Sequence, residues 1–353
     1  MNQQSDSKTF AEQLAQHTRN GDLFTTENDN DIRCHACGIR CLIKNNRSGV
    51  CKVRFNQDGQ LKVPFGYTAG YNCDPIEKKP FFHFMPGTNA MSFGMMGCNL
   101  HCAFCQNWHT SQAIRDANAG GGIRPITAEE MVDLAIRYGA KTITSTYNEP
   151  LITSEWAVEI FRHAKQKGLH TSYVSNGNGT PEVIQYLKPW LDGFKVDLKC
   201  FNPKNYQKLG GSLDSVLETI DLLHQNNFWV EIVTLVVPKL NDSPEELRDI
   251  ARFIASVDKN IPWHVTAFHE NYKMYGVGNT KLNTLLNAGN IGKEEGLRFV
   301  YVGNVHGHAP EWENTYCPEC NTLLIERCGF RISQNNVADG ACPECNAIIP
   351  GIW

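Results

Sequence analysis

Cysteines are the residues of this chain with the most evident capacity for chemistry. The 353-residue sequence contains 14 of them, and all but Cys73 and Cys200 fall into three groups, at residues 34–51, 98–105 and 317–345. The N-terminus shows no basic segment followed by an apolar core, so we expect no signal peptide and a cytoplasmic location. Clustered cysteines in that reducing compartment bind metals more often than they form disulfides. The spacing therefore predicts metal-binding segments.

The central group, Cys98, Cys102 and Cys105, predicts a reactive iron site. A structural zinc ion requires four protein ligands, and no fourth cysteine lies near this segment. A 4Fe–4S cluster held by three cysteines leaves one iron open to a further ligand. An open iron indicates a site for chemistry rather than a purely structural one. The alternative is a zinc knuckle completed by a distant histidine or cysteine.

The two outer groups each offer four ligands. Cys317-x2-Cys320 and Cys342-x2-Cys345 are paired knuckles, which predict a zinc-ribbon or rubredoxin-like module, with zinc favoured over iron. Cys34, Cys37, Cys41 and Cys51 could hold zinc, hold a second iron–sulfur cluster that relays electrons, or remain a reduced, metal-free loop. Six bases and one acid lie between Asp31 and Arg54. They could stabilise thiolates, dock an acidic electron donor, or simply form a solvated face.

The elements between the outer groups alternate as strand and helix. Expected strands cover residues 91–96, 141–146, 169–175, 194–198, 228–237, 264–268 and 297–302. Expected helices cover residues 127–138, 153–167, 181–187, 212–225, 244–256 and 280–286 or beyond. Six or seven β/α units predict an α/β fold with a parallel sheet, curved or closed as a barrel. The loops that follow the strands should then carry the chemistry.

Composition and charge restrict the function classes. Hydrophobic residues make up 41% of the chain and charged residues 20%, which is typical of a globular protein. The net charge of −4 argues against nucleic acid or a membrane surface as partner.

The cysteine groups and the expected elements divide the chain into four parts. We expect a polar N-terminal tail or helix (1–30), a Cys-rich module (31–85), a barrel (86–308) and a C-terminal module (309–353).

The C-x3-C-x2-C motif, with Phe104 before its last cysteine, resembles the radical S-adenosylmethionine (SAM) superfamily. That resemblance implies a partial (β/α)6 TIM-like barrel and a 4Fe–4S cluster whose open iron chelates SAM. It also implies a one-electron donor of flavodoxin or ferredoxin type. Reductive cleavage of SAM would give a 5′-deoxyadenosyl radical that abstracts hydrogen from a substrate.

The same resemblance implies roles for further residues. Phe104 would shield the cluster. Tyr147, Asn148 and Glu149 stand where the superfamily carries a Gly-Gly-Glu-like motif that holds the SAM amino group. Ser175-Asn176 and Asp197-Leu-Lys199 resemble loops of pyruvate formate-lyase activating enzymes that approach the SAM ribose and carboxylate.

Several longer segments resemble a narrower family, the radical SAM proteins of the AmmeMemoRadiSam system. The segments are Asp74-Pro-Ile-Glu-Lys-Lys-Pro80, Phe82-His-Phe-Met-Pro-Gly87, Cys105-Gln-Asn-Trp108, Phe268-His-Glu-Asn-Tyr-Lys-Met274 and Tyr301-Val-Gly-Asn-Val305. This family is related to pyruvate formate-lyase activating enzymes, and the resemblance covers roughly residues 30–353.

The substrate side is predicted from single polar residues near the expected strands. We expect some of Glu77, Lys78, His83 and His269 to reach a small-molecule, peptide or protein substrate; His306 and His308 follow the last expected strand. Two other functions compete with the general one. One is activation of a glycyl-radical enzyme, and the other is a non-catalytic zinc-binding interaction module, which predicts that the central triplet holds zinc or nothing.

Overall fold

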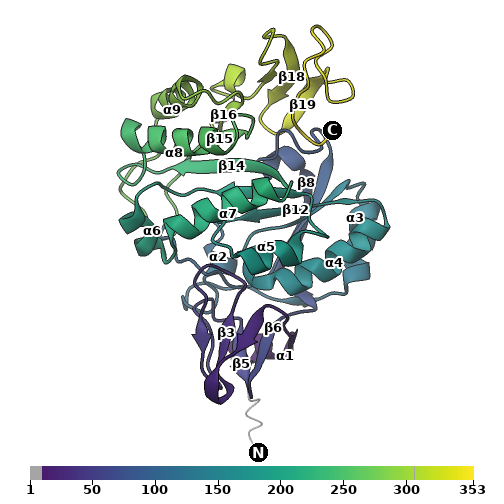
Figure 1. The fold of residues 1–353 in the computed structure, drawn as a ribbon, viewed down its shortest axis with the longest axis vertical. Helices are drawn as coiled ribbons and strands as arrows, with labels where there is room; N and C mark the ends of the chain where they lie inside the picture. The colour runs from purple at the N-terminus through teal and green to yellow at the C-terminus, as the bar shows by residue number, and fades with distance from the viewer. Residues whose placement is uncertain (1–9, 306) are drawn as a thin grey trace, which may run out of the picture.

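The structure is a computed structural model that describes residues 10–305 and 307–353. Residues 1–9, the start of the predicted tail, and His306 lie outside the described residues. Figure 1 shows a small N-terminal module at one end, an α/β body in the middle and a β-rich C-terminal module at the other end. The outer cysteine groups belong to the two end modules, and the central group belongs to the body.

The body is built on one eight-stranded sheet with the order β16-β15-β14-β13-β12-β11-β9-β8. Its strands are β8 (Gly70–Pro75), β9 (Asn89–Gly94), β11 (Thr142–Ser145), β12 (His170–Ser175), β13 (Gly193–Asp197), β14 (Trp229–Val236), β15 (Trp263–Ala267) and β16 (Val300–Gly303). The seven strands from β9 to β16 are parallel. All their carboxyl ends therefore lie at one edge of the sheet, as the sequence predicted.

Helices connect the parallel strands. They are α3 (Ala128–Arg137), α4 (Ser154–Gln166), α5 (Pro181–Leu187), α6 (Pro203–Leu209), α7 (Leu213–Gln225), α8 (Pro244–Val257) and α9 (Leu282–Glu294). The predicted capping box before α3 is present: Thr127 accepts a hydrogen bond from the Glu130 amide, and Glu130 accepts one from the Thr127 amide. The partial (β/α)6 barrel is confirmed.

Strand β8 was not among the expected strands. It pairs antiparallel with β9, so that Gly70 lies opposite Gly94 and Pro75 lies opposite Asn89. Since β9 runs from Asn89 to Gly94, the segment that follows Pro75 begins at the amino edge of the sheet. This register decides where the predicted substrate residues lie.

The N-terminal module consists of two three-stranded antiparallel sheets with the orders β1-β6-β5 and β2-β3-β4. It contains α1 (Phe10–Gln16), β1 (Thr18–Asn20), β2 (Phe24–Thr26), β3 (Ile32–Cys34), β4 (Leu42–Ile43), β5 (Phe55–Gln57) and β6 (Gln60–Pro64). Strands β7 (Tyr67–Thr68) and β10 (Arg124–Pro125) form a separate pair. Strands β1 and β2 lie within the predicted tail or helix (1–30), but they pair with β6 and β3 of the predicted Cys-rich module. Residues 18–26 therefore belong to the same sheets as that module.

The C-terminal module contains β17 (Thr315–Tyr316), β18 (Leu323–Cys328) and β19 (Arg331–Asn335) in one antiparallel sheet. Strands β18 and β19 form a hairpin between the two cysteine knuckles. An apolar cluster that includes Phe82, Phe299, Leu324 and Ile325 packs this module against the barrel. Among the described residues, no helix has the length and apolar character needed to span a membrane.

Candidate active site and metal centres

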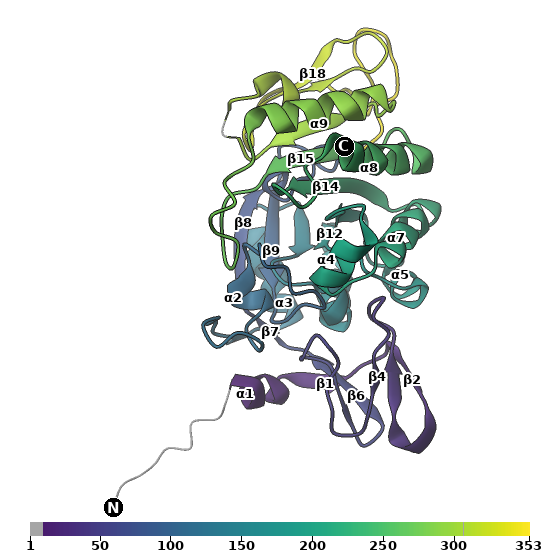
Figure 2. The ribbon, with the colours of Figure 1, turned by 90° about the vertical axis from the view of Figure 1, so that its left-hand side faces the viewer.

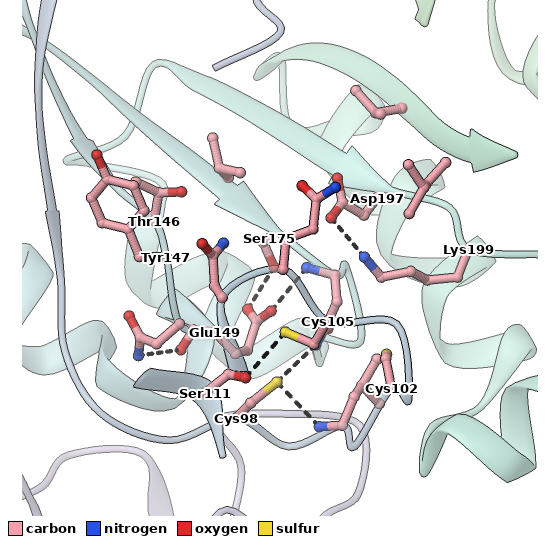
Figure 3. Close-up of a pocket in the computed structure, with 18 of the residues that line it drawn as sticks. Cys98, Cys102, Cys105, Ser111, Thr146, Tyr147, Glu149, Ser175, Asp197 and Lys199 are labelled. Atoms are coloured by element: carbon pink, nitrogen blue, oxygen red, sulfur yellow. Dashed lines mark hydrogen bonds and ion pairs between the residues drawn. The ribbon is translucent and has the colours of Figure 1, made fainter. Parts of the chain in front are cut away.

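A cavity of about 210 Å³ opens where the parallel strands end. The residues around it come from the loop after β9 and from the carboxyl ends of β11 to β15. Its lining consists of Cys98, Leu100, Cys102, Phe104, Cys105, Gln106, Asn107, Ser111, Thr146, Tyr147, Asn148, Glu149, Val174, Ser175, Asn176, Asp197, Lys199, Val233, Leu235 and Thr266. The central cysteines and all eight predicted cofactor-binding residues are thus brought together at one cavity (Figure 3).

Polar groups of the protein surround the three thiols. The Leu100 amide lies 3.3 Å from the Cys98 sulfur, and the Ser111 hydroxyl lies 3.2 Å from the Cys105 sulfur. Burial raises the pKa of Cys102 to about 11, against the opposing effect of the Lys199 ammonium. The Cys102 thiol is therefore protonated at neutral pH until a metal displaces its proton.

The carboxylate of Glu149 is fixed at the base of the cavity. It accepts hydrogen bonds from the Ser175 hydroxyl at 2.6 Å, the Asn176 amide at 2.8 Å and the Leu151 amide at 3.0 Å. Burial nevertheless raises the pKa of Glu149 to about 7. A cationic ligand group placed beside it would restore the ionised form.

Tyr147 occupies a backbone conformation that glycine favours. Its φ is +70°, in the left-handed region, at a position where the resembling motif carries glycine. The neighbouring strand β9 leaves room for the Tyr147 turn only because its residue 94 is glycine. A Cβ on Gly94 would lie 2.8 Å from the Thr146 carbonyl oxygen and from the Tyr147 Cβ. The Asn148 side chain fixes the same turn, because its Oδ1 accepts a hydrogen bond from the Met95 amide at 3.0 Å. The loop therefore retains the glycine-type backbone without the glycine.

Asp197 lies between two lysines at the end of β13. The Lys199 ammonium is 2.7 Å from one carboxylate oxygen, and Lys195 contacts the other. Burial by itself would raise the pKa of Asp197, but the two ammonium groups outweigh it and lower the pKa to about 2. The cavity therefore presents a permanently ionised carboxylate and a lysine next to the cysteine loop.

Sequence reasoning missed three polar residues that support this site. Lys195 was absent from the predicted set, although a lysine inside an apolar strand was a usable signal. Asn99, within the cysteine motif, accepts a hydrogen bond from the Asn176 side chain at 2.7 Å and is 1% exposed. Ser111, at the end of the short helix α2 (Trp108–Ser111), had no local signal because its contact with Cys105 depends on the turn of the loop.

The predicted substrate residues do not line the cavity. Glu77 is buried and accepts a hydrogen bond from the Gly87 amide at 2.7 Å, and Lys78 is paired with Asp74 at 3.0 Å. His83 is fully buried between Pro350 and Tyr301. His269 is half-buried after β15, at the carboxyl edge of the sheet, with Nε2 3.3 Å from the Asn304 carbonyl oxygen. Their action on a substrate stays a prediction.

A neighbour of these residues does approach the cavity. The Lys79 ammonium is 3.1 Å from an Asp74 carboxylate oxygen and 3.2 Å from the Tyr147 hydroxyl. Since Tyr147 lines the cavity, this buried lysine connects the segment after β8 to the site.

The C-terminal cysteines have the spacing of a single-ion site. The ligand atoms of Cys317, Cys320, Cys342 and Cys345 all lie within 4.8 Å of one another. Sulfurs 317 and 345 are 3.5 Å apart, and sulfurs 320 and 342 are 3.6 Å apart. A tetrahedral zinc ion with zinc–sulfur bonds of about 2.3 Å requires a separation of about 3.8 Å. The four residues therefore fit one tetrahedral metal ion, and Cys328 lies outside the set.

The central and N-terminal cysteines are spaced differently. Across residues 10–305 and 307–353, only the C-terminal set brings three or more candidate ligand atoms within 4.8 Å of one another. Each thiolate of a four-iron cluster binds a different iron, so its ligand sulfurs lie further apart than those around one ion. The spacing of Cys98, Cys102 and Cys105 suits such a cluster.

Comparisons with known proteins agree with this geometry. The model of the radical SAM superfamily matches residues 94–254. The uncharacterized protein MJ0808 of Methanocaldococcus jannaschii is 39% identical over 322 residues, which cover 90% of this chain and 94% of that protein. Pyruvate formate-lyase 1-activating enzyme of Escherichia coli K12 is 27% identical over 236 residues, with coverage of 61% and 93%.

Among solved structures, a radical SAM methyltransferase from Sphaerobacter thermophilus matches with a TM-score of 0.49 and 16% identity, over 62% of this chain and 67% of that one. The family match begins at Gly94 and spans the cysteine loop and the carboxyl ends of β11 to β14. The chain belongs to the radical SAM superfamily and is an enzyme related to the pyruvate formate-lyase activating enzymes.

Proposed function

We propose that the cavity binds SAM beside a 4Fe–4S cluster held by Cys98, Cys102 and Cys105, and that the enzyme abstracts hydrogen from an organic substrate. The observation that carries the proposal is the meeting of the three thiols with Glu149, Ser175, Asn176, Asp197 and Lys199 around one cavity. When bound, the cluster supplies the electron that cleaves SAM into methionine and a 5′-deoxyadenosyl radical.

The residues around the cavity divide the binding of SAM between them. Glu149 offers a carboxylate to the N–H groups of the SAM amino group, and Ser175 and the Asn176 amide hold that carboxylate in place. Lys199 offers an ammonium to the carboxylate end of SAM, and Asp197 keeps it charged and oriented. Apolar Phe104, which is 4% exposed, limits the access of water to the cysteine loop.

We infer that the C-terminal cysteines bind zinc as a structural ion, since zinc is the usual occupant of a closed four-thiolate site.

The enzyme would take electrons from a flavodoxin- or ferredoxin-type donor in the cytoplasm. All 14 cysteines are free, which is the state that a reducing compartment maintains. The family resemblance further supports a radical SAM protein of the AmmeMemoRadiSam type.

Two alternatives differ in their predictions. A glycyl-radical activase is supported by the 27% identity with the Escherichia coli activating enzyme, and it requires a protein substrate. A non-catalytic zinc module would use the outer cysteine sets, of which the C-terminal one has single-ion spacing, and it predicts that the central triplet holds zinc or nothing.

The test is anaerobic reconstitution with iron and sulfide, reduction, and addition of SAM. Formation of 5′-deoxyadenosine in the wild type but not in Cys102→Ala supports the proposal. A reconstituted cluster that leaves SAM intact would refute it. A glycyl-radical signal that appears only when a candidate protein is added would identify the activase reaction.

A further inference from the structure

We propose that Cys34, Cys37, Cys41 and Cys51 form the site of a second iron–sulfur cluster, seated against the catalytic cysteine loop. The sequence left zinc, a cluster or no metal as alternatives for this group. The spacing, the environment and the position of the four thiols favour a cluster.

The first argument is spacing. The C-terminal set has the close sulfur contacts of a single ion, whereas no three of the N-terminal sulfurs lie within 4.8 Å of one another. The four residues are nevertheless grouped, since the Cys34 amide donates to the Cys41 carbonyl at 2.9 Å and Cys37 packs with Cys51 in one buried cluster. Four grouped thiols that are too widely spaced for one ion suit a cluster in which the ligands bind separate irons.

The second argument is the environment of the sulfurs. Cys34, Cys37 and Cys51 are each 6% exposed, and Cys41 is half-buried. Backbone N–H groups donate hydrogen bonds to three of the sulfurs. The donors are Ile39 to Cys37, Val53 to Cys51, and Val50 to Cys41 at 3.5 Å. A dry pocket with amide donors on its sulfurs stabilises an anionic metal–thiolate group.

The third argument is position. A single guanidinium, that of Arg115, donates to the Leu100 carbonyl at 2.8 Å and also to the Val50 carbonyl, so it bridges the residue before Cys51 and the catalytic loop. A Cβ on Gly97, the residue before Cys98, would lie 3.1 Å from the Cys51 carbonyl oxygen. The segment around Cys51 therefore lies beside the start of the catalytic cysteine loop.

A second contact joins the modules on the other side of Cys37. The Gly38 amide donates to the Asn178 carbonyl at 2.9 Å, two residues beyond Asn176 of the cavity. Figure 2 shows the N-terminal module below the body, on the side of the body where α2 lies. A purely structural metal would not need this proximity, whereas an electron relay does.

The outer face of the module suits an electron donor. Lys44, Arg47 and Lys52 are exposed on the segment that connects Cys41 with Val53. In the proposed relay, one electron leaves a reduced flavodoxin- or ferredoxin-type protein, which is oxidised. The N-terminal cluster is reduced by that electron and then returns to its oxidised state by passing it to the catalytic site. No bond and no proton changes place.

The decisive measurement is acid-labile sulfide, because a structural zinc or rubredoxin-like ion contributes none. The full chain is reconstituted anaerobically as wild type, as Cys34→Ala/Cys37→Ala and as Cys98→Ala/Cys102→Ala. We expect the wild type to hold about four sulfides at the catalytic site and about two or four more at the second site. Each double variant should lose only its own share, and Cys328→Ala, which changes an exposed cysteine outside all three sets, should match the wild type.

The outcomes separate the second cluster from the proposed function. The relay role of the second cluster rests on the proposed function, but the existence of that cluster does not. About four sulfides in the wild type, unchanged in Cys34→Ala/Cys37→Ala, would overturn the second cluster and leave the catalytic one. Sulfide retained in Cys98→Ala/Cys102→Ala supports the second cluster, even if Cys34→Ala/Cys37→Ala does not fold. Complete loss of sulfide from Cys98→Ala/Cys102→Ala overturns the second cluster. For the relay, SAM cleavage by Cys34→Ala/Cys37→Ala should be lost with reduced flavodoxin and retained with dithionite, and equal activity with flavodoxin would refute that role.

Discussion

Arg54 and Glu155 form a two-point ion pair in the interior of the protein. Arg54 Nη1 lies 2.7 Å from Glu155 Oε2, and Nη2 lies 2.8 Å from Oε1. The side chains are 1% and 0% exposed. Arg54 belongs to the N-terminal module and Glu155 to the first turn of α4, so this pair joins the module to the barrel.

Removal of either partner should therefore destabilise the junction. Arg54→Met leaves the Glu155 carboxylate buried without its partner, and a buried unpaired charge costs about 3–5 kcal/mol. We expect a loss of that size in the free energy of unfolding, measured by urea denaturation. Arg54→Met/Glu155→Leu should recover much of it, because no isolated charge remains. A single variant as stable as the wild type would show that the pair is not the junction's main polar contact.

The proposed catalytic cluster and the proposed C-terminal zinc site should respond differently to cysteine removal. Cys102→Ala should abolish SAM cleavage and lower bound iron and sulfide, because three thiols are the minimum for the catalytic cluster. Cys317→Ala should lower the content of zinc and the melting temperature of the C-terminal module while SAM cleavage continues. Loss of SAM cleavage by folded Cys317→Ala would show that the C-terminal metal takes part in the reaction.

Glu149 should make SAM binding dependent on pH. Burial raises its pKa to about 7 in the protein without SAM, and hydrogen bonds from the SAM amino group should lower it again. Affinity should therefore be highest above pH 7, where the carboxylate is already ionised, and should fall as the pH drops through 7. Isothermal titration calorimetry should detect the release of a proton on binding below pH 7.

A matched variant isolates this carboxylate. Glu149→Gln retains the side-chain shape, and it should bind SAM roughly ten- to a hundredfold more weakly, since a hydrogen bond to a charged group contributes about 1.5–3 kcal/mol. Its affinity should also be insensitive to pH near 7. A variant that keeps the wild-type pH dependence would assign the titration to another group.

His83 should make the stability of the fold dependent on pH. Its Nδ1 must donate to the Pro350 carbonyl at 2.8 Å, and its Nε2 then accepts from the Tyr301 hydroxyl at 2.6 Å, so the ring is neutral. Burial lowers the pKa of His83 to about 4, although the Glu231 carboxylate opposes this; Arg327 and His264 also face the ring and lower the pKa further.

The sign follows from the unfolded value of about 6.5. The folded protein resists protonation, so stability is complete above about pH 6.5 and is lost as the pH falls toward 4, by roughly 3 kcal/mol from this group. Urea denaturation at about pH 7.5 and about pH 5 should show about 2 kcal/mol of this loss, and His83→Gln should reduce the difference. An unchanged pH dependence in His83→Gln would place the titration on His264 or another group.

The positions of the elements could be predicted from the sequence because each signal is local. The capping box at Thr127, the proline at the start of α5 and the apolar runs of the parallel strands lie within the element that they define. Among the strands of the eight-stranded sheet, the exception was β8, whose alternation is weak and whose place depends on pairing with β9. That pairing also explains why Glu77 and His83 lie away from the cavity, since residues after Pro75 begin at the opposite edge of the sheet.

By itself, the sequence determined which residues meet at the catalytic edge. The carboxyl ends of parallel strands lie at one edge of the sheet. Residues at or just after these ends, such as Asp197 and Glu149, therefore had to be neighbours. It could not determine distances between thiols, because these depend on how separate loops fold against one another. Only the tertiary structure placed Cys317 3.5 Å from Cys345 in a single-ion site, left Cys34, Cys37, Cys41 and Cys51 more widely spaced, and set that group against the catalytic loop.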